Sequence, residues 1–178
     1  MMRHKFDASD CKERGDTGEL IFTNLAQNRG WNICYASPDE NMYGHWDILI
    51  SKGKEVYKVD VKGMKRISRY GDELYDWVWI ELHGSMHDNK GWLFGGNADF
   101  IAFETDKSFL MLERARLAKF IPTLIIPGLA KDVSEAKYHI YNRRDYEQLM
   151  LVEIEKLRPI KAGEWEKPKS YYYSLETS

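Results

Sequence analysis

Val59-Asp60-Val61-Lys62-Gly63 predicts a β-strand that is apolar on one side and charged on the other. Val59 and Val61 alternate with Asp60 and Lys62, and this period of two is typical of a half-buried strand. Successive side chains of a strand point to opposite faces, so Asp60 and Lys62 project to the same side while the valines face a core. A carboxylate and an ammonium group are therefore expected side by side at one strand's end.

A second acidic strand is predicted just upstream. His45–Ile50 has strand character and carries Asp47, and residues 51–54 supply the residues of a hairpin turn. Paired as a hairpin, the two strands bring Asp47 and Asp60 together, with Lys62 beside them. Two carboxylates and a lysine in one place suit a hard cation and an activated water.

The remaining elements predict an α/β fold with a mixed central β-sheet flanked by helices. Asp16 or Thr17 caps a helix that runs to about Arg29 and stops at Gly30. Further strands are expected at residues 31–36, 76–82, 98–104, 108–112 and 138–141, further helices at residues 114–120 and 142–157, and a loop at residues 37–41. A helix followed by an antiparallel meander gives an α/β or α+β layer with one polar end.

Three side chains outside the predicted hairpin each have two interpretations. Glu19 is expected in the first turn of the helix. It either interacts favourably with the helix dipole or points at the Asp60 site. Glu81 is either a surface acid or a partner of Lys62, if its strand lies beside that of Asp60. Trp92, in a glycine-flanked aromatic loop at residues 91–96, either contacts a nucleic-acid base or belongs to a small satellite core.

Charge is distributed unevenly along the chain. The net charge of −2 excludes a globally basic nucleic-acid binder. Between Ser51 and Tyr70, however, seven basic residues face only two acidic ones, Glu55 and Asp60. This local excess surrounds the predicted site, where contacts to phosphate would be needed; the alternative is a lysine-rich strand face that protects a sheet edge.

The ordered set of acids and lysine resembles the PD-(D/E)xK nuclease superfamily, whose fold is restriction-endonuclease-like. Asp47, twelve intervening residues and then Asp60-Val61-Lys62 match its motif, and Gly18-Glu19 matches the glutamate that the superfamily often carries on its first helix. The resemblance covers residues 12–105, and Trp46 stands where the motif's name has proline. Phage-type nucleases of this superfamily carry a similar tryptophan-rich strand and Gly-Trp loop before an Ala-Asp strand.

The resemblance implies a metal-dependent deoxyribonuclease that uses Mg²⁺, with Mn²⁺ as a substitute. Asp47, Asp60 and the backbone carbonyl of Val61 are the implied metal ligands, Lys62 positions the attacking water, and Glu19 assists by binding a second ion or a metal-bound water. Lys58, Lys65, Arg66 and Trp92 are the candidate contacts to nucleic acid. Holliday-junction or other branched DNA is an expected substrate, and a non-catalytic DNA-binding module that keeps the fold is the alternative.

Length and composition fit one intracellular domain. With 178 residues and 43% hydrophobic residues, we expect one domain over residues 1–158. The tail at residues 159–178 is expected to pack on that domain, pair as a strand or mediate a homodimer. The two cysteines lack metal-ligand spacing, and with no apolar run near ~20 residues the chain is expected in the cytoplasm, or in a host's cytoplasm if phage-encoded, and away from membranes.

Overall fold

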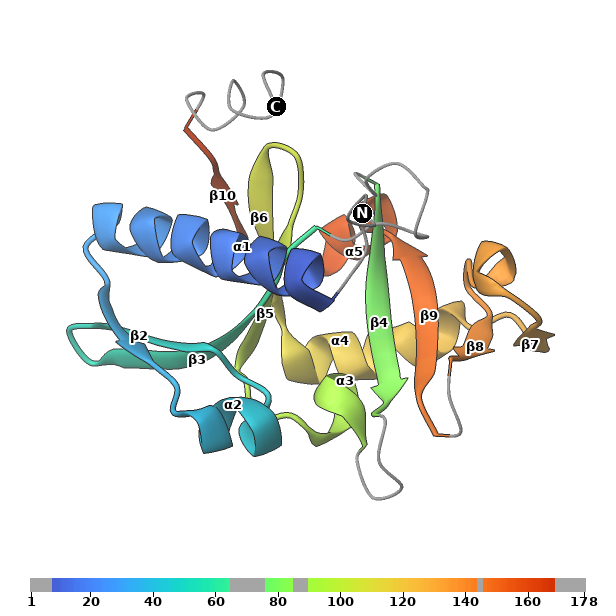
Figure 1. The fold of residues 1–178 in the computed structure, drawn as a ribbon. Coiled ribbons are helices and arrows are strands. Elements are labelled where there is room, and N and C mark those ends of the chain that lie inside the picture. Colours follow the sequence, from blue (N-terminus) through green and yellow to red (C-terminus); the bar gives the residue numbers. More distant parts are fainter. Residues whose placement is uncertain (1–7, 65–75, 85–89, 144–145, 169–178) are drawn as a thin grey trace, which may run out of the picture.

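A six-stranded mixed β-sheet forms the centre of the structure, a computed structural model that describes residues 8–64, 76–84, 90–143 and 146–168, with only the backbone of residues 8–16 (Figure 1). The strand order is β1-β2-β3-β5-β6-β10, and only the β3–β5 pair is parallel. The strands are β1 (Asn32–Tyr35), β2 (Ile48–Lys52), β3 (Glu55–Lys62), β5 (Phe100–Glu104), β6 (Ser108–Glu113) and β10 (Gly163–Glu166).

Helix α1 (Ala8–Asn28) covers one face of this sheet, and in Figure 1 the β2–β3 hairpin lies below it. Buried Phe22, Leu25 and Ala26 of the helix join the valines of β3, Val59 and Val61, in one hydrophobic cluster. The helix begins at Ala8, so the start expected at Asp16 or Thr17 is wrong and Glu19 is not in its first turn. It ends where the sequence predicts, before Gly30, whose φ of 79° suits glycine. Because the valines point to α1, Asp60 and Lys62 point to the opposite face of the sheet.

A second, four-stranded sheet packs against that opposite face. Its order is β4-β9-β8-β7, with strands β4 (Trp77–His83), β9 (Gln148–Glu153), β8 (Ile140–Asn142) and β7 (Leu129–Ala130). Ile80 and Val152 from this sheet share a buried cluster with Ile101 and Phe103 from β5. The short helices α3 (Gly91–Gly95), α4 (Arg114–Phe120) and α5 (Ile154–Leu157) also contribute to this cluster. The expected mixed α/β fold with helices flanking a mixed sheet is therefore confirmed.

Several expected elements are wrong in detail. Residues 142–157 were expected to be a helix, but they contain strand β9 and only the four-residue helix α5. The expected loop at residues 37–41 begins helix α2 (Pro38–Gly44), because Ser37 and Glu40 form a capping box. The expected loop at residues 91–96 is mostly helix α3. Strand β4 belongs to the second sheet and is not a neighbour of β3.

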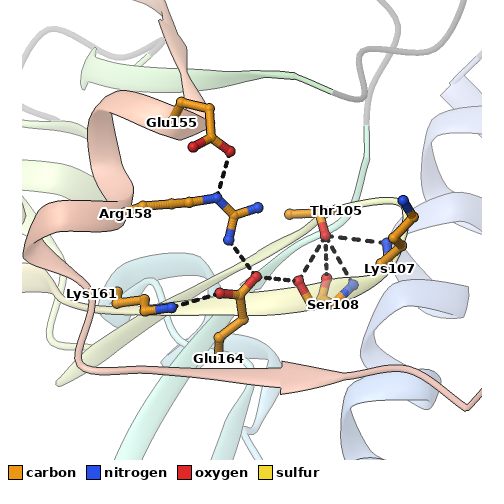
Figure 2. Close-up of polar contacts among 7 residues, drawn as sticks. All are labelled: Thr105, Lys107, Ser108, Glu155, Arg158, Lys161 and Glu164. Atoms are coloured by element: carbon orange, nitrogen blue, oxygen red, sulfur yellow. Dashed lines mark hydrogen bonds and ion pairs between the residues drawn. The ribbon is translucent and has the colours of Figure 1, made fainter.

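The segment after residue 158 pairs as a strand, one of the three alternatives for the tail. β10 runs antiparallel to β6, and Figure 2 shows how Glu164 fixes it: its carboxylate accepts hydrogen bonds from Arg158, Lys161 and Ser108. These three partners lower the pKa of Glu164 to about 2, although burial alone would raise it. The strand is thus held to the sheet by charged contacts as well as by its backbone.

A buried ion pair follows β10 directly. Lys167 Nζ lies 2.7 Å from Glu104 Oε1 and donates a second hydrogen bond to the Thr105 carbonyl. The other oxygen of Glu104 accepts from the Met64 N–H at 3.1 Å. Glu104 therefore connects the chain just after β3 to the chain just after β10.

No helix within the described part of the chain is long and apolar enough to cross a membrane.

Candidate active site

Asp47 extends the β2–β3 pairing by using its side chain in place of a backbone carbonyl. Its own N–H donates to the Val59 carbonyl at 3.0 Å, and Ile48 is the first residue of β2 to pair with β3. β3 continues past the residue that pairs with Ile48, and there the Asp47 side chain takes over from β2. Asp47 Oδ2 accepts a 2.7 Å hydrogen bond from the Val61 N–H. The carboxylate is thereby held against the end of β3.

Asp60 and Lys62 lie side by side on the face of β3 that points away from α1. Lys62 Nζ is 2.7 Å from Asp60 Oδ1, and the Asp60 side chain is only 3% exposed. Asp60 Oδ2 is buried and has no hydrogen-bond partner among the described residues. A buried carboxylate oxygen without a partner is costly, so a proton, a water or a cation at this oxygen would be favourable.

The two carboxylates repel each other. Burial and the negative charge of Asp60 together raise the pKa of Asp47 to about 7, against the opposing effects of Lys62 and the Val61 N–H. Near neutral pH the protein therefore keeps a second negative charge at this place only at a cost. A proton or a cation relieves it.

Lys62 remains a cation in this arrangement. Burial by itself would lower the pKa of Lys62, but the charge and hydrogen bond of Asp60, together with Asp47 and Glu81, raise it above its usual value. A side-chain amine with a raised pKa holds its proton and acts as a hydrogen-bond donor and a positive charge.

The donor set at this place fits a Mg²⁺ ion. Asp47 and Asp60 supply hard oxygen donors, and the partnerless Asp60 Oδ2 is one that a cation would satisfy. The Val61 carbonyl points to the same edge of β3 as the Val61 N–H, which is the edge that Asp47 occupies. Within the described residues no group of three or more His, Cys, Asp or Glu side chains is placed to hold a metal. A site with two carboxylates suits Mg²⁺, which takes its other ligands from water and phosphate.

Glu19 does not form a three-acid cluster with Asp47 and Asp60 among the described side chains. It is half-buried on α1, which packs on the valine face of β3 rather than on the face of Asp60. The assistance expected from Glu19 stays a prediction.

The candidate nucleic-acid contacts fall in different places. Lys58 lies on the same face of β3 as Asp60, with its Nζ 4.9 Å from the centre of the Trp46 ring. Lys65 and Arg66 lie outside the described residues. Trp92 is only 5% exposed and belongs to a core cluster, which agrees with the second of its two interpretations. Its contact with a base stays a prediction.

Two contacts at the site are not expected from the sequence: Asn41 is not singled out there, and Trp92 is considered only as a contact to a base or as part of a small core. Asn41 on α2 donates a hydrogen bond from Nδ2 to Asp47 Oδ1. Trp92 on α3 lies over Lys62, with 5.2 Å between Nζ and the ring centre. Neither residue is ionisable, and both reach the site through contacts between elements that are not paired in the sheet. A search for acids and lysines in one hairpin could not find them.

The chain matches no protein-family model, and a search of curated proteins finds no match either. Among solved structures, it is similar to a bacterial homing endonuclease, I-Ssp6803I, with 16% sequence identity and a TM-score of 0.46. The match covers 61% of this chain and 72% of the other. A similarity this low does not by itself assign an activity.

Proposed function

We propose that this protein is a metal-dependent nuclease that hydrolyses DNA phosphodiester bonds at the end of the β2–β3 hairpin. The observation that carries the proposal is the buried Asp60 carboxylate, which has one oxygen on Lys62 and the other without a partner among the described residues, next to a second acid that is itself difficult to ionise. The resemblance of Asp47, Asp60 and Lys62 to the PD-(D/E)xK motif supports the same conclusion.

Asp47, Asp60 and the Val61 carbonyl would hold Mg²⁺, with Mn²⁺ as a substitute. The bound ion would supply positive charge to neutralise the phosphate and favour deprotonation of a water. Asn41 and the Val61 N–H hold the Asp47 carboxylate in its orientation. This leaves Asp60 to face the reacting group.

Lys62 would orient the attacking water and stabilise negative charge that develops on the phosphate. Its pKa is raised, so we assign it the role of a donor rather than a base. The salt bridge to Asp60 and the ring of Trp92 keep its ammonium group within reach of the same place.

DNA is the proposed partner because the segment from Ser51 to Tyr70 is locally basic in a chain of net charge −2. We propose branched DNA, such as a Holliday junction, as a substrate. We also propose that the protein acts as a homodimer. The second candidate is a DNA-binding module without catalysis. The observation that favours it is the local basic segment, which would bind phosphate with or without catalysis.

The test is cleavage of a panel of DNA substrates by purified protein in Mg²⁺, Mn²⁺ or EDTA. The panel contains supercoiled plasmid, linear duplex, single strand, a flap and a four-way junction. Asp60→Ala and Lys62→Ala are the test variants, and Lys137→Ala, which removes an exposed lysine on the second-sheet side, is the matched control.

We expect cleavage that needs the metal, is lost in both test variants and persists in the control. Cleavage that survives Asp60→Ala would contradict the proposed site. If every substrate is bound but none is cut, and calorimetry detects no Mg²⁺ binding, the protein is the non-catalytic module instead.

A further inference from the structure

The ammonium group of Lys62 contacts the ring of Trp92 as well as the carboxylate of Asp60. The Lys62 Nζ is 2.7 Å from Asp60 Oδ1 and 5.2 Å from the centre of the Trp92 ring. Both distances are within the range of direct interaction, since a cation within about 6 Å of a ring centre is attracted by the ring's negative face. The Lys62 side chain is 25% exposed.

The Trp92 ring is itself held firmly. It packs edge-on against Phe103 of β5 with 6.0 Å between ring centres. The backbone N–H of Trp92 donates to Glu81 Oε1 at 3.3 Å, which ties α3 to β4. Gly91 allows this close approach, because its φ is 66° and a Cβ there would lie 3.0 Å from the Glu81 carbonyl oxygen.

This arrangement matters because a lysine side chain is long and flexible. The ammonium group of an unrestrained lysine samples many rotamers. A lysine that donates a hydrogen bond in a reaction must occupy the one rotamer that reaches the reacting group. Asp60 gives the ammonium group one contact, and the ring of Trp92 gives it a second. Trp92 is therefore placed to restrict Lys62 to the rotamer that reaches the site.

We propose that Trp92 is a positioning residue that holds Lys62 against Asp60. Its consequence for catalysis rests on the proposed nuclease function, while the contact itself does not. The alternative is that Trp92 only fills the core, as its place in the cluster with Ile101 and Phe103 would allow. If Trp92 positions Lys62, the effects of changing the two residues on stability depend on each other. If Trp92 only fills the core, the two effects are independent.

The first experiment is a double-mutant cycle on stability, which needs no nuclease activity. The midpoint of urea unfolding is measured for Trp92→Leu, Lys62→Met and the double variant. Trp77→Leu with Lys137→Met is the matched cycle, because Lys137 Nζ lies 4.3 Å from the Trp77 ring centre in the second sheet. Trp92→Phe replaces Trp92→Leu if the leucine variant does not fold.

We expect the midpoint shifts of Trp92 and Lys62 variants to be non-additive, with a smaller combined shift than the sum. Additive shifts would overturn the proposal, because a tryptophan that only fills the core has no specific coupling to the lysine. The Trp77–Lys137 cycle shows the coupling that a ring–ammonium contact gives in this protein.

The second experiment measures cleavage by Trp92→Phe and Trp92→Leu beside Trp77→Phe and Trp77→Leu. We expect kcat to fall about 10- to 100-fold in Trp92→Leu, with KM within about twofold, because a misplaced catalytic group slows the reaction rather than weakening binding. Trp92→Phe should recover part of kcat, since it keeps a ring. The Trp77 variants should keep the wild-type kcat.

The two proposals fail in distinguishable ways. If the wild type cuts no DNA but the stability cycle is non-additive, the positioning contact stands and the nuclease function fails. If the wild type cuts DNA while the cycle is additive and kcat in Trp92→Leu matches that in Trp77→Leu, the nuclease stands and the positioning role fails.

Discussion

Two acids and one lysine share the end of the β2–β3 hairpin, so the charges at this place do not balance. Asp60 is paired with Lys62, and Asp47 is left with hydrogen bonds but no cation of its own among the described residues. This arrangement costs folding stability while Asp47 is ionised. The imbalance is expected where a charged ligand completes the structure.

Asp47→Asn should therefore make the metal-free protein more stable. A carboxyl with a pKa of about 7 in place of 3.8 disfavours the ionised folded state, so removing the charge should add about 1–3 kcal/mol to the free energy of unfolding at pH 8. Mg²⁺ binding should be lost in the same variant. Urea unfolding and calorimetry measure the two effects.

The control for this prediction is Asp106→Asn, because the Asp106 side chain is 48% exposed at a turn. It should change the unfolding free energy by less than about 0.5 kcal/mol. A loss of stability in Asp47→Asn at pH 8 would show that the hydrogen bonds of the carboxylate outweigh its burial.

The sequence predicts the charged centre of the site but not the residues around it. Asp47, Asp60 and Lys62 come together because a hairpin with a period of two places them on one face, and this relation is local. The contacts of Asn41 and Trp92 depend on where α2 and α3 pack, which no local pattern specifies. The contact between β3 and α3 is set by tertiary packing.

At the scale of elements, β9 is a strand in a segment whose sequence pattern predicts a helix. Leu149, Met150 and Ile154 lie near helical spacing, but Gln148–Glu153 is a strand buried on both faces. A short, continuously apolar run fits a buried strand and a buried helix equally well, because neither exposes a polar face. The alternating strands β3 and β4 were predicted because each keeps one polar side.

β10 depends on Glu164, which predicts a stability that varies with pH. The folded-state pKa of Glu164 is about 2, below its usual 4.5, so its contribution is fully present above about pH 4.5 and is lost as pH falls towards 2. Glu164→Gln should lower the free energy of unfolding by about 2–3 kcal/mol at pH 7 and have little effect near pH 2.

Urea unfolding at pH 7, 5 and 3 measures this difference. Glu166→Gln is the matched control on the same strand, because Glu166 is exposed. An effect of Glu164→Gln that is equally large at every pH would mean that the side chain acts through packing rather than through its charge.

At the scale of the whole molecule, the two sheets share one core. Ile80 on β4 is fully buried in the same cluster as Ile101 and Phe103 on β5. A cavity made in one sheet therefore removes contacts from the other. We expect the described domain to unfold as a single cooperative unit.

Ile80→Ala should destabilise the protein by about 2–5 kcal/mol while keeping one unfolding transition. Circular dichroism and tryptophan fluorescence should give the same midpoint. Leu129→Ala on β7 is the control, because Leu129 is 64% exposed and its truncation leaves no cavity. Midpoints that separate in Ile80→Ala would show that the second sheet melts by itself.

The buried pair of Glu104 and Lys167 joins two parts of the chain that are synthesised at different times. All strands next to the site, including β5, leave the ribosome well before Lys167 does. Until then Glu104 has the Met64 N–H but lacks its lysine. A nascent chain can therefore assemble the β2–β3–β5 unit early, and arrival of Lys167 ends the period in which Glu104 must stay hydrated. The Glu104–Lys167 contact therefore forms after the strands around the site are available to pair.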